Sequence, residues 1–311
     1  MANTTQHMAS QLEQLASRAN GAGNTLIVCP VTNPWYPALA QLKTVDSVLG
    51  SSQIYPTLSS AVAAAVSGRG DTIVVTPGTY TQTSELVVDK NNLTIVGAGA
   101  QPEATKVVGP TTAGAHGIKV TASYVLVKNL QAIANSSGQS AGIAVFGSNC
   151  TIDGCRLGDT VAPTQSCGIV VPAALSTAGI FGTRILNCKI DTSVIGILLT
   201  AAATPKLYSN TEIANCLFQG NTSNDIKTTN SGTDVSASIS IRDNTIIPGS
   251  ATTPLDLAAT TAQFSGIICN NRIAVATNAK ANITGGKTLN AVQLYVGNYT
   301  QAGVTTAVPG P

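Results

Sequence analysis

The segment Gly117-Ile118-Lys119-Val120 decides the fold of this chain, because five later segments can be laid over it. Those five are Gly142-Ile143-Ala144-Val145, Gly168-Ile169-Val170-Val171, Gly196-Ile197-Leu198-Leu199, Asp225-Ile226-Lys227-Thr228 and Pro254-Leu255-Asp256-Leu257. Each of the six is followed by a second strand-like run and then by a residue suited to a turn. The turn residues are Asn129, Gly154, Asn187, Asn215, Asp243 and Asn270.

These turn residues recur at a nearly regular spacing. Successive members lie 25, 33, 28, 28 and 27 positions apart, and the same frame extends back to Gly97 and forward to Asn298. A repeat of about 20–50 residues is typical of a solenoid, in which each unit buries its apolar face only against its neighbours. Asn or Gly at the turn suits the left-handed backbone of a sharp bend. The sequence therefore predicts an all-β solenoid of about eight coils over residues 55–300, followed by a tail over residues 301–311.

Composition limits the classes of partner. Charged residues make up only 10% of the 311 residues, whereas about 25% is usual in a soluble domain. The net charge of +2 comes without a Lys/Arg cluster, and no apolar run approaches the roughly 20 residues that span a bilayer. We therefore expect neither a nucleic acid nor a membrane as a partner. The first residues lack the basic and apolar regions of a secretory signal, so we expect synthesis in a host cytoplasm.

Three of the seven cysteines share one position of the repeat. Cys155, Cys188 and Cys216 each follow a turn residue directly. In a stack of parallel coils this position recurs about every 4.8 Å, so we expect a column of buried free thiols that pack as small apolar groups. A linear column does not converge on a point, and only His7 and His116 could add imidazole ligands. We therefore expect no metal and no cofactor.

The region before the repeat, residues 1–54, does not fit its frame. We expect a short helix over residues 5–20, in which Leu12 and Leu15 belong to an apolar stripe. A strand-like run over residues 25–29 follows, and a Pro-rich turn then carries Trp35 and Tyr36. Two interpretations remain open. The region is either an arm that docks on another protein through these four side chains, or a cap on the end of the solenoid.

Residues 57–67 predict an amphipathic helix that begins after Thr57. Its apolar stripe contains Leu58, Val62, Ala65 and Val66, and Thr is a favourable N-cap residue. The end of a solenoid leaves an open core and unpaired strand edges, so it needs a cover. We expect this helix to provide it.

The stretch from Gly70 to Tyr80, which reads GDTIVVTPGTY, resembles the start of the right-handed parallel β-helices of the pectin-lyase-like superfamily. In that family a capping helix leads into such a stretch, and the first coil closes with a motif found here as Leu93 to Gly99, LTIVGAG. The resemblance covers roughly residues 55–299 and implies the fold. It implies little about activity, because lyases, hydrolases, epimerases, tailspikes and inert structural proteins share this opening.

Few residues could carry the polysaccharide chemistry of such enzymes, which needs paired carboxylates or acidic calcium ligands. Asp225 and Asp256 lie near the starts of their coils, and Asp159 and Asp191 follow their Cys positions by four and three residues. Stacking could bring either pair together. The motifs of polygalacturonase-like enzymes are missing, and only Ala115-His116-Gly117 comes near one of them. We therefore expect no catalytic site, with these four carboxylates as the remaining candidates.

A rigid, weakly charged β-helix without a catalytic signature resembles a structural component of a bacteriophage virion. Tailspikes share the fold but carry a separate C-terminal domain, whereas the coils here continue almost to residue 300. We therefore expect a decoration (cement) protein on the head surface, homotrimeric and bound to the major capsid protein. A tail fibre or tailspike component that binds host surface glycans and a polysaccharide lyase or hydrolase are the alternatives.

Overall fold

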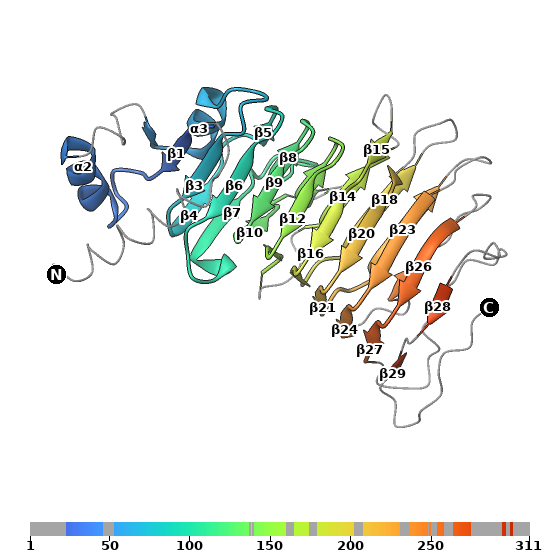
Figure 1. Ribbon diagram of the computed structural model, residues 1–311. Helices are drawn as coiled ribbons and strands as arrows, with labels where there is room; N and C mark the ends of the chain where they lie inside the picture. The colour runs from blue at the N-terminus through green and yellow to red at the C-terminus, as the bar shows by residue number, and fades with distance from the viewer. Residues whose placement is uncertain are drawn as a thin grey trace.

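The computed structural model describes residues 23–45, 53–136, 138, 140–159, 165–173, 179–201, 208–230, 237–247, 249, 254–257, 264–274, 294–296 and 299–300. These residues form a parallel β-helix, in which three long sheets extend along one axis (Figure 1). Each turn of the chain adds one strand to sheet A, the next to sheet B and the next to sheet C. The predicted all-β solenoid is confirmed, and sheet C receives seven strands, close to the expected eight coils.

Sheet A contains, in spatial order, β2 (Ile54–Tyr55), β1 (Thr25–Val28), β3 (Thr72–Val75), β6 (Thr94–Gly97), β9 (Leu126–Lys128), β12 (Thr151–Asp153), β16 (Arg184–Leu186), β20 (Thr211–Ala214), β23 (Ala237–Arg242), β26 (Phe264–Cys269) and β28 (Leu294–Val296). Sheet B contains β4 (Gly78–Thr81), β7 (Thr105–Val108), β10 (Gln131–Ile133), β13 (Arg156–Leu157), β17 (Lys189–Asp191), β21 (Leu217–Gln219), β24 (Thr245–Ile247), β27 (Arg272–Ile273) and β29 (Tyr299–Thr300). Sheet C contains β5 (Leu86–Val88), β8 (Ile118–Val120), β11 (Ala141–Val145), β14 (Cys167–Pro172), β18 (Ile195–Ala201), β22 (Asn224–Asn230) and β25 (Leu255–Asp256). A small fourth sheet pairs β15 (Ile180–Phe181) with β19 (Tyr208–Ser209).

The core is built from columns of side chains that stack from one turn to the next. In sheet B the strand register aligns the buried residues Val107, Ala132, Leu157, Ile190, Phe218, Ile246 and Ile273. In sheet C it aligns Ile118, Ile143, Ile169, Ile197, Ile226 and Leu255. Burying one such side chain contributes about 1.5–3 kcal/mol, so a single turn cannot offset its own ordering entropy. Stacked turns share the core and stabilise one another.

The turn between sheets A and B has a left-handed backbone in each repeat. Asn129, Gly154, Asn187, Asn215, Asp243 and Asn270 have φ values between 50° and 60°. From Asn129 to Asp243, the backbone N–H of each of these turn residues donates to a carbonyl oxygen of the next turn, for example Asn187 to Ala214 at 3.0 Å. The strand register aligns Gly97 with Asn129, as predicted, but Gly97 still belongs to β6 and is not among the residues with positive φ. Any Cβ atom there would overlap the carbonyl oxygen of Asn129, which explains the glycine by close approach.

A second left-handed ladder lies at the corner where sheet A begins. Its members are Asn92, Tyr124, Asn149, Gly182 and Asn210, with φ values between 54° and 68°. The backbone N–H of Tyr124 donates to Ser148 at 2.9 Å, and that of Gly182 donates to Ser209 at 2.8 Å. This ladder was not predicted, although four of its five positions hold Asn or Gly.

The capping helix is α3 (Leu58–Ala64), and it contacts β1, β2, β3 and β5 at the N-terminal end of the stack. Thr57 and Ser60 form a reciprocal capping box, as the Thr57 hydroxyl accepts from the Ser60 backbone N–H at 3.1 Å. Leu58 and Val62 are buried, as predicted. Val66 is not part of the apolar stripe, because the helix ends two residues earlier and leaves this side chain 50% exposed.

Replacing Thr57 with Ala should lower the free energy of unfolding by about 1 kcal/mol, because two N-terminal hydrogen bonds of α3 are lost. Urea denaturation followed by circular dichroism measures the change. Ser59→Ala, an exposed position in the same helix, is the matched control and should change stability by less than about 0.5 kcal/mol. Equal effects of the two variants would mean that the capping box does not stabilise the end of the stack.

Residues 23–45 and 53–55 lie at the end of the solenoid, which favours the cap among the two interpretations left open for residues 1–54. Strand β1 lies between β2 and β3 in sheet A, so the sheet begins before residue 55. Helix α2 (Tyr36–Val45), which was not predicted, packs beside the outer side of β1 through Leu39. The turn of the chain that contains β1 adds no strand to sheet B or sheet C. The three-strand repeat is therefore not visible in this part of the sequence.

The proposed docking residues have mixed outcomes. Trp35 and Tyr36 are half-buried and pack against the cluster of Ile27, Cys29, Leu39 and Val74 on their own chain. Leu12, Leu15, the predicted helix over residues 5–20, Asn298 and the tail over residues 301–311 lie outside the described residues.

Candidate functional site

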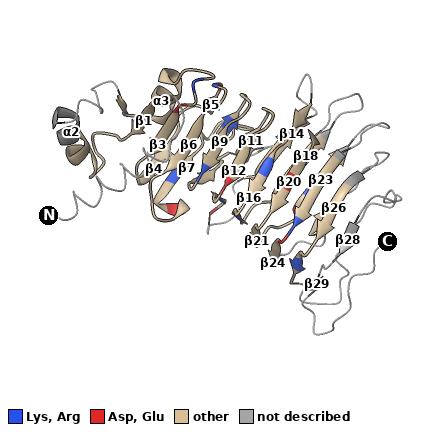
Figure 2. Cartoon of the chain, viewed as in Figure 1, with Lys and Arg blue, Asp and Glu red and all other residues tan. Residues whose placement is uncertain are grey.

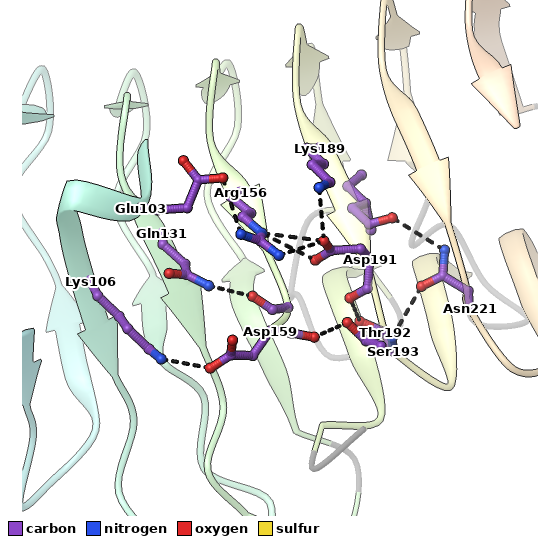
Figure 3. A network of polar contacts seen from close by, with 12 residues as sticks. Glu103, Lys106, Gln131, Arg156, Asp159, Lys189, Asp191, Thr192, Ser193 and Asn221 are labelled. Carbon is purple, nitrogen blue, oxygen red and sulfur yellow. Dashed lines mark hydrogen bonds and ion pairs between the residues drawn. The ribbon is translucent and has the colours of Figure 1, made fainter. Parts of the chain in front are cut away.

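Charged residues are spread thinly along the stack (Figure 2). One cluster of polar contacts lies on the outer face of sheet B. It is called the sheet B network here and consists of Glu103, Lys106, Gln131, Arg156, Asp159, Lys189 and Asp191 (Figure 3). The strand register places Lys106, Gln131, Arg156 and Lys189 in one outward row across β7, β10, β13 and β17. Glu103 is contributed by the short 3-10 helix η2 (Pro102–Ala104).

Arg156 is the centre of this network. Its guanidinium donates to Asp191 from Nη2 at 2.8 Å and from Nε at 3.2 Å, and to Glu103 Oε1 from Nη1 at 3.1 Å. Lys189 Nζ approaches Asp191 Oδ2 at 3.4 Å. Burial lowers the pKa of Arg156, but its hydrogen bonds and charge attraction to Asp191 and Glu103 outweigh that effect and raise the pKa overall. The arginine therefore stays charged and joins three turns.

Asp159 is held separately from Asp191. Its carboxylate accepts from Lys106 Nζ at 2.6 Å, and its backbone carbonyl accepts from the Thr192 hydroxyl. The Gln131 amide donates to the carbonyl oxygen of Gly158 at 2.6 Å, which fixes the same loop to β10. Stacking thus brings Asp159 and Asp191 into one network, as considered from the sequence, but each carboxylate binds a different cation.

A buried polar chain follows the corner between sheets B and C. Gln165 accepts from the backbone N–H of Ala134 at 2.9 Å and donates to Ser193 Oγ at 2.8 Å. The backbone N–H of Ser193 donates to Asn221 Oδ1 at 3.1 Å, and Asn221 Nδ2 donates to Asp225 Oδ1 at 2.7 Å. This chain links four successive turns within the described residues and ends at a carboxyl group inside the β-helix.

Asp225 is fully buried, and its Oδ2 has no hydrogen-bond partner. It occupies a position of sheet C that holds glycine in the four preceding turns (Gly117, Gly142, Gly168 and Gly196). At Gly196 an added Cβ would meet side chains from the interior, Phe218 and Asn221. Burial raises the pKa of Asp225 to about 6, and the hydrogen bond from Asn221 lowers it by a smaller amount.

Asp225 and Asp256 are not brought together. Asp256 follows the buried Leu255 and pairs with Lys227 Nζ at 3.4 Å, whereas Asp225 lies sealed inside the stack. Successive residues of a strand point to opposite sides, so Lys227 and Asp256 share the outer face of sheet C. This pair is therefore not a candidate for acid–base catalysis, because substrate in solvent reaches at most one of its members.

Ion pairs engage the carboxylates throughout the described part of the chain. Apart from Asp225, every Asp and Glu there lies within 4 Å of a Lys or Arg nitrogen. On sheet A, Glu212 accepts from Arg184 at 2.8 Å and from Arg242 at 2.5 Å, which joins three successive strands. The two arginines lower the pKa of Glu212 chiefly through these hydrogen bonds. The few charges of this chain thus connect neighbouring turns.

The predicted thiol column lies in the core. Cys155, Cys188 and Cys216 are buried and in register, and each Sγ is 3.6 Å from a carbonyl oxygen of the preceding turn. Asn244 and Asn271 continue the same column, and their amides donate to Ile213 and Ile241 at 3.1 and 3.0 Å. The thiols therefore occupy the place of a hydrogen-bonding asparagine ladder.

Among the predicted turn residues, Asn187 also donates a hydrogen bond from its side-chain amide to Asp153 Oδ1 at 2.7 Å, on the outside of the stack.

The sequence analysis missed Arg156, Glu103, Lys106 and Gln131. The sequence did contain a signal for this row, because Gln131, Arg156 and Lys189 each stand two positions after a turn residue. Glu103 lies in a loop outside the repeat and could not be placed from its spacing. Within the described ranges, no group of three or more His, Cys, Asp or Glu side chains could hold a metal ion. No helix described by the structure is long and apolar enough to cross a bilayer.

No protein-family model matches the sequence, and no curated protein matches it. Solved structures do match. Pectate lyase Pel9A aligns with a TM-score of 0.55 and 14% identity over 83% of this chain, and pectin methylesterase from carrot aligns with a TM-score of 0.56 and 13% identity over 91% of it. The fold is a right-handed parallel β-helix of the pectin-lyase-like kind. This chain spans 65% of the length of the pectate lyase and 85% of that of the carrot enzyme.

At these identities the likeness concerns the fold alone. A third match, the Escherichia coli protein ybhc, has a TM-score of 0.54 and 13% identity and covers 90% of this chain and 86% of its own. ORF18 of Geobacillus virus E2 aligns with a TM-score of 0.44, which carries no argument about function. Function has to be inferred from the residues of this chain.

Proposed function

We propose that this chain is a non-enzymatic structural protein of a bacteriophage particle and that it decorates the head surface. One observation carries the non-enzymatic part. Every described carboxylate except Asp225 is neutralised by Lys or Arg, and Asp225 is sealed in the core. An inverting or retaining glycosidase needs two carboxyl groups that face one substrate, and a lyase needs a base that is free to take a proton.

The same contacts support a mechanical role. Arg156, Arg242 and the two left-handed ladders tie each turn to the next, while the surface stays nearly uncharged. A particle component needs such rigidity and low self-repulsion. Assignment to the head, with the major capsid protein as partner and a homotrimer as the assembled form, extends the analogy with β-helix virion proteins.

The deciding measurement is the copy number of this chain relative to the major shell protein in purified particles, by quantitative mass spectrometry. We expect a fixed ratio of the order of one chain or one trimer per few shell subunits. A handful of copies per particle would indicate that the protein lies in the tail and not on the head, and binding of host glycans would then be its natural role. Absence from particles would overturn the structural role.

A polysaccharide-acting enzyme is the second candidate. The observation that favours it is the grouping of Arg, Lys and carboxylates on the outer face of sheet B in a fold shared with a pectate lyase and a pectin methylesterase. Incubation of the purified protein with pectin and other acidic polysaccharides, followed by reducing-end and methanol assays, separates the two candidates. Turnover that Asp191→Asn abolishes while the variant remains folded by circular dichroism, and that Asp256→Asn leaves unchanged, would establish the enzyme.

A further inference from the structure

Two aromatic side chains are exposed at the corner where sheet A begins, away from the sheet B network. Tyr124 is 59% exposed and Phe181 is 40% exposed. Tyr124 is a member of the second left-handed ladder, and Phe181 directly precedes Gly182, the ladder member two turns further along. Stacked strands lie about 4.8 Å apart, so the two residues are separated by about 10 Å along the axis.

Tyr124 is unusual for its place in the ladder. The other members are Asn92, Asn149, Gly182 and Asn210, residue types that adopt positive φ readily, whereas a Tyr at φ 60° is strained. Nothing in the core explains the aromatic ring, because most of its surface faces solvent. A strained backbone that carries an exposed aromatic side chain points to a contact outside the chain.

Small polar groups lie between the two rings. Ser123 Oγ accepts from the backbone N–H of Ser148 at 3.2 Å, and Ser148 Oγ accepts from the backbone N–H of Phe181 at 3.2 Å. Each hydroxyl uses a lone pair in this contact and keeps its own proton for donation. Both serines are half-buried, so the corner between the rings is a hydrogen-bonding surface that solvent reaches.

We propose that Tyr124 and Phe181 form a stacking platform for a glycan of β-1,4-linked pyranose units. The apolar C–H face of a pyranose packs on an aromatic ring, while its hydroxyls bond to polar side chains at the edge. An extended β-1,4 chain presents the same face of every second unit at a spacing close to two turns of this β-helix. The unit between them then lies over Ser123 and Ser148. The platform does not rest on the proposed particle role, since it is argued only from Tyr124, Phe181 and the serines between them.

Isothermal titration of the full chain with cellohexaose and with N-acetylchitohexaose tests the platform. We expect the wild type to bind at least one of them and Tyr124→Asn and Phe181→Ser each to weaken binding at least tenfold. Ile247→Ser is the matched control, because Ile247 is likewise 40% exposed but lies in sheet B. Its affinity should equal that of the wild type.

The melting temperature of Tyr124→Asn separates a binding residue from a structural one. Asn adopts the left-handed backbone more easily than Tyr, so the variant should melt at the same temperature as the wild type or higher. Failure of the wild type to bind either hexasaccharide would overturn the platform. Equal losses in Ile247→Ser, or loss of particle incorporation in Tyr124→Asn without any glycan affinity, would overturn it as well.

Discussion

Cys188→Asp should lower the free energy of unfolding by about 4 kcal/mol or more, and Cys188→Asn should be tolerated. Cys188 is buried in the thiol column between Cys155 and Cys216. Burial, together with the two neighbouring thiols, raises the pKa of Cys188 well above its ordinary value, so this position disfavours a negative charge. A carboxylate there would be an unpaired charge in the core, which costs several kcal/mol.

Asn has nearly the shape of Asp and provides what this column requires. Asn244 and Asn271 already occupy the column, donate to the preceding turn and accept from backbone N–H groups, as Asn244 does from Cys216 at 2.9 Å. An amide at position 188 can make the same contacts, with the carbonyl of Ile152 as acceptor. The exchange of a thiol for an amide should therefore change stability by less than about 1.5 kcal/mol.

Thermal and urea unfolding of the two variants provide the comparison. Because Asp and Asn differ little in volume, cavity and overpacking effects nearly cancel between them. A melting temperature of Cys188→Asp equal to that of the wild type would show that position 188 does not face the core. Similar destabilisation by both variants would show that the column cannot exchange thiols for amides.

The fold could be predicted because a stack of turns repeats its requirements. Each turn needs a left-handed residue between sheets A and B, and Asn187, Asn215 and Asn270 meet that need with residue types that stand out in a sequence. The cap was visible for a similar reason, since Thr57 precedes an amphipathic run. The strand at residues 25–29 was predicted, but its place in sheet A was not, because its turn adds no strand to sheets B and C and so shows no repeat.

The polar contacts could be predicted only in part. Asp159 and Asp191 were placed in adjacent turns from spacing, but their partners Lys106 and Arg156 were not identified, although the register of β7, β10 and β13 places both in one outward row. The direction in which Asp225 points depends on a local change in a strand of sheet C, where its position is occupied by glycine in preceding turns. Because glycine has no side chain, the alternation of polar and apolar residues in those turns does not indicate whether this position faces the core or the solvent.

Asp225→Asn should stabilise the protein at pH 7.5 and lose this advantage at pH 4. The pKa of the buried carboxyl is raised from 3.8 to about 6, chiefly by burial. Above pH 6 the group is ionised in both the folded and the unfolded chain, and the folded chain bears the full penalty. A shift of roughly two pKa units corresponds to about 3 kcal/mol.

The pH window follows from the direction of that shift. As the pH falls through 6, the folded chain takes up a proton that the unfolded chain does not yet bind, so wild-type stability rises relative to the variant. Below about pH 3.8 both states are protonated and the difference stops changing. The change in the difference between pH 7.5 and pH 4, measured by urea denaturation, should therefore approach 3 kcal/mol.

A matched control is Asp256→Asn on the outer face of sheet C. It removes the ion pair with Lys227, which contributes about 0–1 kcal/mol, so the variant should be equal to or slightly less stable than the wild type at pH 7.5. The amide at position 225 brings two N–H donors beside the site of the unpaired Oδ2, which makes the absolute stability at one pH a poor criterion. The pH dependence removes that ambiguity, because the amide does not titrate. Parallel stability curves for wild type and Asp225→Asn would mean that this carboxyl binds its proton equally in the folded and the unfolded chain, so that burial does not raise its pKa.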